Sequence, residues 1–195
     1  MPALGELRQR VFHATSGLYT ETYHMDNLLN DALNQLVEIA KLRGVQTLSL
    51  VPGTDTYTLA DNFKSPGQLL DTNEQNCAIP YELVDITENR FGYAIENWNI
   101  IIKPVPQQSK ELTHYYYKYA TQLVNDSDVP EIDSQYHDLL STYAAGMILL
   151  LPTLQIQDKT LSDRYLVRWQ EGKLNFANDM QRKNKATRGR TVNLW

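Results

Sequence analysis

This sequence is short of the residues on which most catalytic and metal-binding sites depend. Its 195 residues include four histidines and a single cysteine, Cys77, which excludes an internal disulfide and leaves little material for a zinc cage. A Cys77–His137 pair across the fold stays open, although no local pattern supports it. Glycine-rich phosphate-binding loops, nucleophile-elbow serines and paired-histidine zinc motifs are also missing. We therefore expect a protein that is not an enzyme and that uses neither a cofactor nor a metal.

Long hydrophobic runs are missing as well. The longest, residues 147–151, is far shorter than the about 20 residues that a membrane span requires, so we expect no membrane partner. Hydrophobic residues make up 42% of the chain and charged residues 21%, which is ordinary for a globular protein. A chain of 195 residues suits one domain, with or without an inserted subdomain.

Acidic residues are absent from the C-terminal end. After Asp179 there are five bases and no acid, and the rest of the chain carries 13 bases against 23 acids, a net charge of −10. Such a tail either docks on an anionic surface or is a solvated, disordered terminus, and its composition fits both. The acidic body argues against DNA binding, because a surface that grips DNA needs bases.

Periodic apolar residues predict four helices. They cover residues 4–14, 26–43, 134–151 and 159–184. Asp26 is interpreted as the N-cap of the second helix, and Gly44 as the residue just past its end. Together with Gly53 and Pro130, Gly44 is interpreted as a residue that sets the shape of the chain.

Between the second and third helices the sequence alternates as strands do. Residues 47–51 and 56–59 predict a hairpin around a Pro-Gly turn, whereas residues 63–76 are polar and predict a loop. A strand is also predicted near residues 81–86. A second hairpin is predicted over residues 91–103, and an aromatic strand over residues 112–119.

These elements predict an α+β fold with its strands in the middle. We expect a helical bundle built from residues 1–45 and 125–184, with an antiparallel sheet of five or six strands inserted over residues 46–124. Residues 185–195 are expected to form an extended C-terminal tail.

The aromatic strand has two different faces. Alternation places Tyr115, Tyr117 and Tyr119 on one face, and Tyr116 with its neighbours His114 and Lys118 on the other. One subunit would have difficulty burying both faces, and tyrosine is common at protein interfaces. The tyrosines are therefore candidate contacts to a neighbouring subunit or to another protein. The alternative is that one face packs inside the subunit while the other is half-exposed.

An acidic turn separates this strand from the third helix. It contains four carboxylates, at Asp126, Asp128, Glu131 and Asp133. A calcium loop of the EF-hand type would need a glycine and a terminal glutamate that this turn lacks. Carboxylates that cap the following helix are the simpler interpretation.

Several segments, taken in order, resemble the head-to-tail adaptor (connector) proteins of tailed bacteriophages. The segments are LSLVPGTDTYTL (48–59), IIIKPVP (100–106), YYY (115–117), DSDVPE (126–131), YHDLL (136–140) and YAA (143–145). The resemblance implies a structural virion protein without enzymatic activity. Such proteins form a ring, usually of twelve copies, that joins the portal to the tail nozzle, tube or stopper. Genome DNA passes through the ring without specific binding. The location implied is the virion neck, after assembly in the host cytoplasm.

The resemblance also implies that the C-terminal segment docks on the portal. The candidate portal-binding residues are Arg182, Lys183, Lys185, Arg188, Arg190, Leu194 and Trp195. Two other functions stay open. The basic tail, with Trp195 available for base stacking, could serve a DNA-binding protein. The chain could also be another neck protein, a stopper or tail-completion protein, although those are smaller and mainly β.

Overall fold

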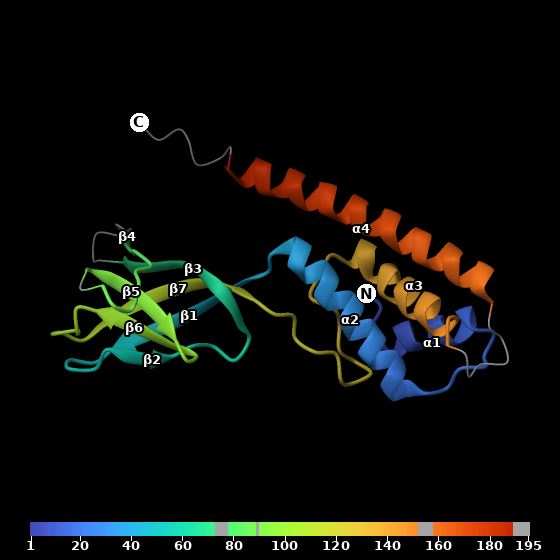
Figure 1. The fold of residues 1–195 in the computed structure, drawn as a ribbon, viewed down its shortest axis with the longest axis horizontal. Coiled ribbons are helices and arrows are strands. Elements are labelled where there is room, and N and C mark those ends of the chain that lie inside the picture. Colours follow the sequence, from blue (N-terminus) through green and yellow to red (C-terminus); the bar gives the residue numbers. More distant parts are fainter. Residues whose placement is uncertain (73–77, 89, 152–157, 189–195) are drawn as a thin grey trace. The chain divides into compact units, whose positions relative to one another are not determined.

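The chain folds into two compact units, which are described separately below. The computed structural model describes residues 1–72, 78–88, 90–151 and 158–188, and of residues 72, 78 and 184–188 the backbone only. The helical unit comprises Met1–Lys41 and Ala120–Trp195, and the β unit comprises Leu42–Tyr119 (Figure 1). Helices near both ends and strands in the middle confirm the predicted α+β class. Within the described ranges, no helix has the length and apolar character required to cross a membrane.

Helix α3 is the centre of the helical unit, because α1, α2 and α4 all pack against it (Figure 1). The helices are α1 (Leu4–Ala14), α2 (Thr22–Ala40), the short 3-10 helix η1 (Ser134–Tyr136), α3 (His137–Ile148) and α4 (Lys159–Arg188). Each long helix contributes a buried apolar stripe, as the periodicity predicts. The most deeply buried residues of these stripes include Leu7, Leu33, Leu140, Trp169 and Phe176.

The ends of α2 and α4 differ from the predicted ones. Helix α2 begins at Thr22, so Asp26 lies inside it, and the Asp26 carboxylate pairs with Arg8 rather than capping the helix. It ends at Lys41, which adopts a left-handed conformation (φ 53°) and donates its backbone N–H to the Val37 carbonyl. Helix α4 continues to Arg188, so residues 185–188, predicted as extended, are helical. Residues 189–195 lie outside the described residues.

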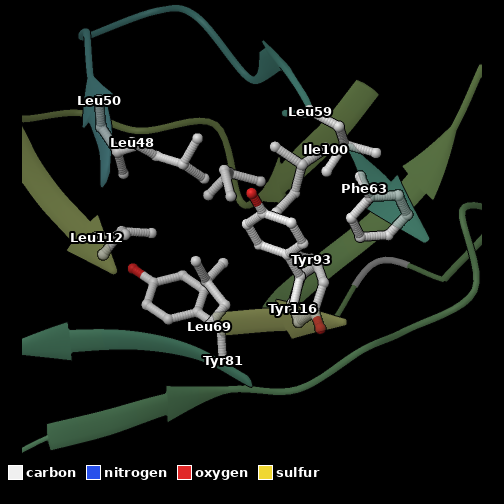
Figure 2. Packing of buried hydrophobic residues seen from close by; sticks show 11 residues of the cluster. Leu48, Leu50, Leu59, Phe63, Leu69, Tyr81, Tyr93, Ile100, Leu112 and Tyr116 are labelled. Carbon is white, nitrogen blue, oxygen red and sulfur yellow. The ribbon is translucent and has the colours of Figure 1, made fainter. Parts of the chain in front are cut away.

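Seven strands, counted over the described residues, form two antiparallel sheets in the β unit. They are β1 (Arg43–Leu50), β2 (Thr56–Thr58), β3 (Phe63–Thr72), β4 (Ala78–Tyr81), β5 (Gly92–Glu96), β6 (Asn99–Lys103) and β7 (Lys110–Lys118). One sheet has the order β1-β7-β3-β4 and the other β2-β6-β5. Apolar side chains from both sheets meet in one core, shown in Figure 2.

Two predictions about the strands were wrong. The proposed hairpin of residues 47–51 and 56–59 does not form, because β1 pairs with β7 in one sheet and β2 pairs with β6 in the other. Residues 63–72, predicted as loop, form β3. Its Pro66 and Gly67 fit into the strand because the register with β7 shifts there, as in a β-bulge.

Other local predictions were confirmed. Strands β5 and β6 pair as the predicted second hairpin. Gly53 has a φ of +81°, which suits glycine in the turn after β1. Gly44 also sets the shape of the chain, but for a different reason than predicted. It lies in β1, where a Cβ would come within 2.4 Å of the Tyr116 ring.

Candidate interaction surfaces

The C-terminal bases extend along the last turns of α4. The Arg182 guanidinium is 83% exposed and lies 3.9 Å from the Asp179 carboxylate, whereas Lys183 pairs with Asp133 at 2.9 Å. Cations in the last turns of a helix interact favourably with its dipole. Lys185 and Arg188 are helical, with only their backbone described, and Arg190, Leu194 and Trp195 lie outside the described residues.

The inward face of β7 belongs to the core of the β unit. Tyr116 is 5% exposed and donates a hydrogen bond from its hydroxyl to Asn62 Oδ1 at 2.8 Å. Its ring lies against Phe63 and His114. Tyr116 therefore packs within its own subunit, so its proposed role as an interface residue does not fit the structure.

The outward face of β7 offers tyrosines to a partner. Tyr115 is 40% exposed and Tyr119 48%, while Tyr117 is half-buried. Tyr115 pairs across the sheet with Val45, which is 60% exposed, and Lys64 Nζ lies 5.4 Å from the centre of the Tyr119 ring. We call Tyr115, Tyr117 and Tyr119 with Val45 the tyrosine face. It combines accessible apolar area with hydroxyl groups that can bond to a partner.

The acidic turn after β7 uses its four carboxylates locally. Asp126 pairs with Arg8, and Asp128 accepts the backbone N–H groups of residues 124 and 125 at 2.8 Å. Those two bonds are the main cause that lowers the pKa of Asp128. Glu131 accepts the Thr121 hydroxyl at 3.1 Å, and Asp133 caps η1 through the Gln135 N–H. Each carboxylate has its own partner, so the turn acts as a structural joint.

No reactive constellation appears in the part of the chain that the structure describes. It contains no group of three or more histidine, cysteine or acidic residues placed to hold a metal. The His137 ring nitrogens lie 3.3 and 3.0 Å from the backbone carbonyl oxygens of Pro2 and Ile132. Cys77, its hypothetical partner, lies outside the described residues.

Comparison with protein families shows to which family the chain belongs. The model of the SU10 adaptor protein family matches residues 2–192, nearly the whole chain. The chain belongs to the SU10 adaptor protein family. The predicted resemblance to phage head-to-tail adaptors is thereby confirmed, and the family indicates a structural component of a bacteriophage virion. No curated protein matches the chain.

The adaptor has an exposed tryptophan that no sequence pattern singled out. Trp98 is 64% exposed and, with Asn97, forms the two-residue turn between β5 and β6. Both residues have positive φ, 48° and 62°, as a type I′ turn requires. Glycine is common in turns of this type. Neither Asn97 nor Trp98 is a glycine, so the sequence lacked the usual signal of a type I′ turn.

The adaptor also has an apolar hollow at the other end of the same hairpin. Its volume is about 240 Å³. The Tyr81 and Phe91 rings lie 4.4 Å apart at this hollow, and Lys110 Nζ lies 5.1 Å from the centre of the Tyr81 ring. The other apolar lining residues include Leu50, Ile102, Pro104 and Val105. Because these residues come from separate strands and the segments that flank them, only the folded chain brings them together.

Proposed function

We propose that this adaptor forms a ring of twelve copies between the portal and the tail, with a central channel through which genome DNA passes without specific binding. The family match over residues 2–192 is the observation that carries the proposal. The ring belongs to the virion neck and assembles in the host cytoplasm. Its work is mechanical joining, and it requires no catalytic group.

The C-terminal segment is the part of the adaptor that we assign to the portal. It continues directly from α4, so a long helix presents it. Its bases, among them Arg188 and Arg190, suit an acidic portal surface, and Leu194 with Trp195 supplies an apolar anchor at the end.

Deleting residues 189–195 tests this assignment. The truncated protein should keep its far-UV circular dichroism spectrum, because the described helices and strands all end before residue 189, and it should no longer add a ring below purified portals in negative-stain images. The control is Arg164→Gln, which removes an exposed base from the first half of α4. Attachment of the truncated protein at wild-type strength would refute the assignment.

The tyrosine face is assigned to a neighbouring subunit or to a tail component, whether nozzle, tube or stopper. The exposure of Tyr115 and Tyr119, with Val45 beside Tyr115, supports this assignment. Aromatic side chains at the centre of an interface often carry a large share of its binding energy.

The alternative to the adaptor function is DNA binding through the basic tail. The five bases after Asp179 are the observation that favours it. A gel shift with linear duplex DNA at several salt concentrations separates the two functions. A DNA-binding protein should bind tightly at low salt and lose affinity steeply as salt rises, whereas the adaptor should bind weakly throughout. A stopper or tail-completion role suits a mainly β chain, and the four α-helices found in the described residues favour the adaptor.

A further inference from the structure

The turn between β5 and β6 displays Trp98 at a conformational cost. Trp98 occupies the left-handed region (φ 62°), which bulky side chains rarely adopt, and its side chain is 64% exposed. Packing inside its own subunit therefore does not account for the tryptophan. An exposed aromatic residue in a strained turn is a candidate contact to another molecule.

The hollow has the size and lining to receive one large aromatic side chain. Cavities of about 150 Å³ hold a benzene ring, and pockets for drug-sized ligands begin near about 300 Å³. At about 240 Å³, this hollow lies between them. Leu50 and Ile102 are each 2% exposed, whereas Phe91 is 53% exposed and Val105 39%. Two buried aliphatic residues and two accessible apolar residues thus line the same hollow.

Trp98 and the hollow lie at opposite ends of one hairpin, so a subunit cannot fill its own hollow. Trp98 directly precedes β6, and Lys103, at the far end of β6, lines the hollow. Five residues of extended strand span about 16 Å, which is longer than a tryptophan side chain. The hollow can therefore accept Trp98 only from another copy.

The charges around the two features are complementary. Glu96 is exposed two residues before Trp98, and its carboxylate has no hydrogen-bond or ion-pair partner among the described residues. Among the described residues, Lys103 and Lys110 line the hollow and no acidic residue does. Lys103 Nζ donates to the backbone carbonyl of Glu88 at 2.7 Å, whereas Lys110 already forms an ion pair with the Asp71 carboxylate at 2.7 Å, so Lys103 supplies most of the available positive charge. A carboxylate next to Trp98 would be attracted to this end of another copy.

We propose that Trp98 of one copy inserts into the hollow of the next copy, with Glu96 directed towards Lys103. This inference rests on the proposed ring and names a contact between its subunits. The contact joins two different surfaces, which is the kind of interface that closes into a ring. One aromatic side chain buries at most about 250 Å², and a stable interface needs about 1,200 Å² in total. Trp98 is therefore the anchor of a larger interface.

Two variants and their mixture test this contact. Trp98→Ala removes the anchor and keeps the hollow, whereas Val105→Glu places a carboxylate at the hollow, where it repels Glu96, and keeps the anchor. In sedimentation velocity over a wide concentration range, wild-type protein should form oligomers. Each variant alone should associate at least about 30-fold more weakly, as expected for a hot-spot residue. An equimolar mixture should form one-to-one pairs and nothing larger, since only one intact contact remains.

Two further variants serve as controls for this contact. Val51→Ala, at a loop residue that is 54% exposed, should associate like wild type, and Trp98→Phe should associate better than Trp98→Ala. Unchanged circular dichroism spectra would show that the variants are folded. Failure of wild type to associate, association of Trp98→Ala at wild-type strength, or a mixture without pairs would each overturn the proposal. Attachment to purified portal, measured in parallel, tests the adaptor function itself, which stands if Trp98→Ala still attaches.

Discussion

The two units of this adaptor are stabilised in different ways. In the helical unit, charged side chains join separate elements. Arg8 connects α1 to α2 through Asp26 and to the acidic turn through Asp126, and Lys183 connects α4 to Asp133. In the β unit, two sheets enclose a core of aliphatic and aromatic side chains (Figure 2). Helices pack along narrow stripes whose borders remain near water, where ion pairs can form, whereas facing sheets exclude water from a wider area.

The difference extends to how each unit responds to acid. His114 is fully buried in the β unit against the rings of Phe63, Tyr93 and Tyr116, and neither of its ring nitrogens has a hydrogen-bond partner among the described residues. Burial lowers the pKa of His114 from 6.5 to about 4. In the helical unit, the Lys183 hydrogen bond is the main cause that lowers the pKa of Asp133 below its ordinary 3.8. The β unit should therefore lose stability at a higher pH than the helical unit.

Replacing Gly67 by alanine should have the largest effect, and it should act on the β unit. A Cβ at this position would lie 2.4 Å from the Tyr115 carbonyl oxygen and 3.4 Å from the Tyr116 Cα. Backbone atoms cannot move aside without breaking the β3–β7 pairing, so we expect a loss of more than about 3 kcal/mol. Urea denaturation, followed by near-UV circular dichroism, measures it.

The control for Gly67→Ala is Val45→Ala on β1 of the same sheet. Val45 is 60% exposed, so its truncation should change the stability by less than about 0.5 kcal/mol. A similar small loss for Gly67→Ala would mean that the bulge in β3 can relax, and that the β unit tolerates backbone changes better than its packing indicates.

The pH dependence of the β unit should be nearly as large. Above pH 6.5 His114 is neutral in both the folded and the unfolded state, so the stability is complete there. Between pH 6.5 and about 4 the unfolded chain binds a proton that the folded chain does not. The free energy of unfolding should therefore fall by about 1.4 kcal/mol per pH unit, or about 3 kcal/mol in all. Urea midpoints measured at pH values from 7 to 4 test this.

His114→Leu should remove that slope, because leucine has a similar size and no proton to bind. His13→Gln, at an exposed residue of α1, should leave it unchanged. A slope that persists between pH 6.5 and 4 in His114→Leu would assign the acid sensitivity to another group.

The sequence predicted those features of the fold that depend on neighbouring residues. The apolar stripe of α2, including Leu29, Leu33 and Leu36, predicts a helix because the period of 3.6 is local. The β5–β6 hairpin could also be predicted from the sequence, since a two-residue turn joins its strands. The partner strand of β1 could not be predicted from the sequence. Leu48 pairs with Leu112, and alternation does not identify a partner so far along the chain.

The candidate surfaces show the same limit. Alternation separates Tyr115 from Tyr116, but which of them faces the core depends on the second sheet, whose Ile100 and Ile102 complete that core. Likewise, Asp26 has the composition of an N-cap, and only the folded unit brings Arg8 to it. Trp98 carries no sequence signal for exposure, because tryptophan is an uncommon residue for a turn with positive φ.

The smallest predicted effect comes from removing ion pairs of the helical unit, one of them largely buried and the other more exposed. Arg8 Nε lies 2.6 Å from Asp26 Oδ1, and both side chains are about four-fifths buried, with exposed fractions of 19% and 20%. Arg8→Met removes the pairs with both Asp26 and Asp126 and should lower the free energy of unfolding by about 1 kcal/mol, and the part that comes from the buried Asp26 pair should persist at high salt. Lys183→Gln removes the pair with Asp133, where Lys183 is 58% exposed, and its smaller effect should disappear at high salt. Thermal unfolding of both variants at low and high salt makes the comparison, and equal losses at high salt would show that burial does not set the strength of these pairs.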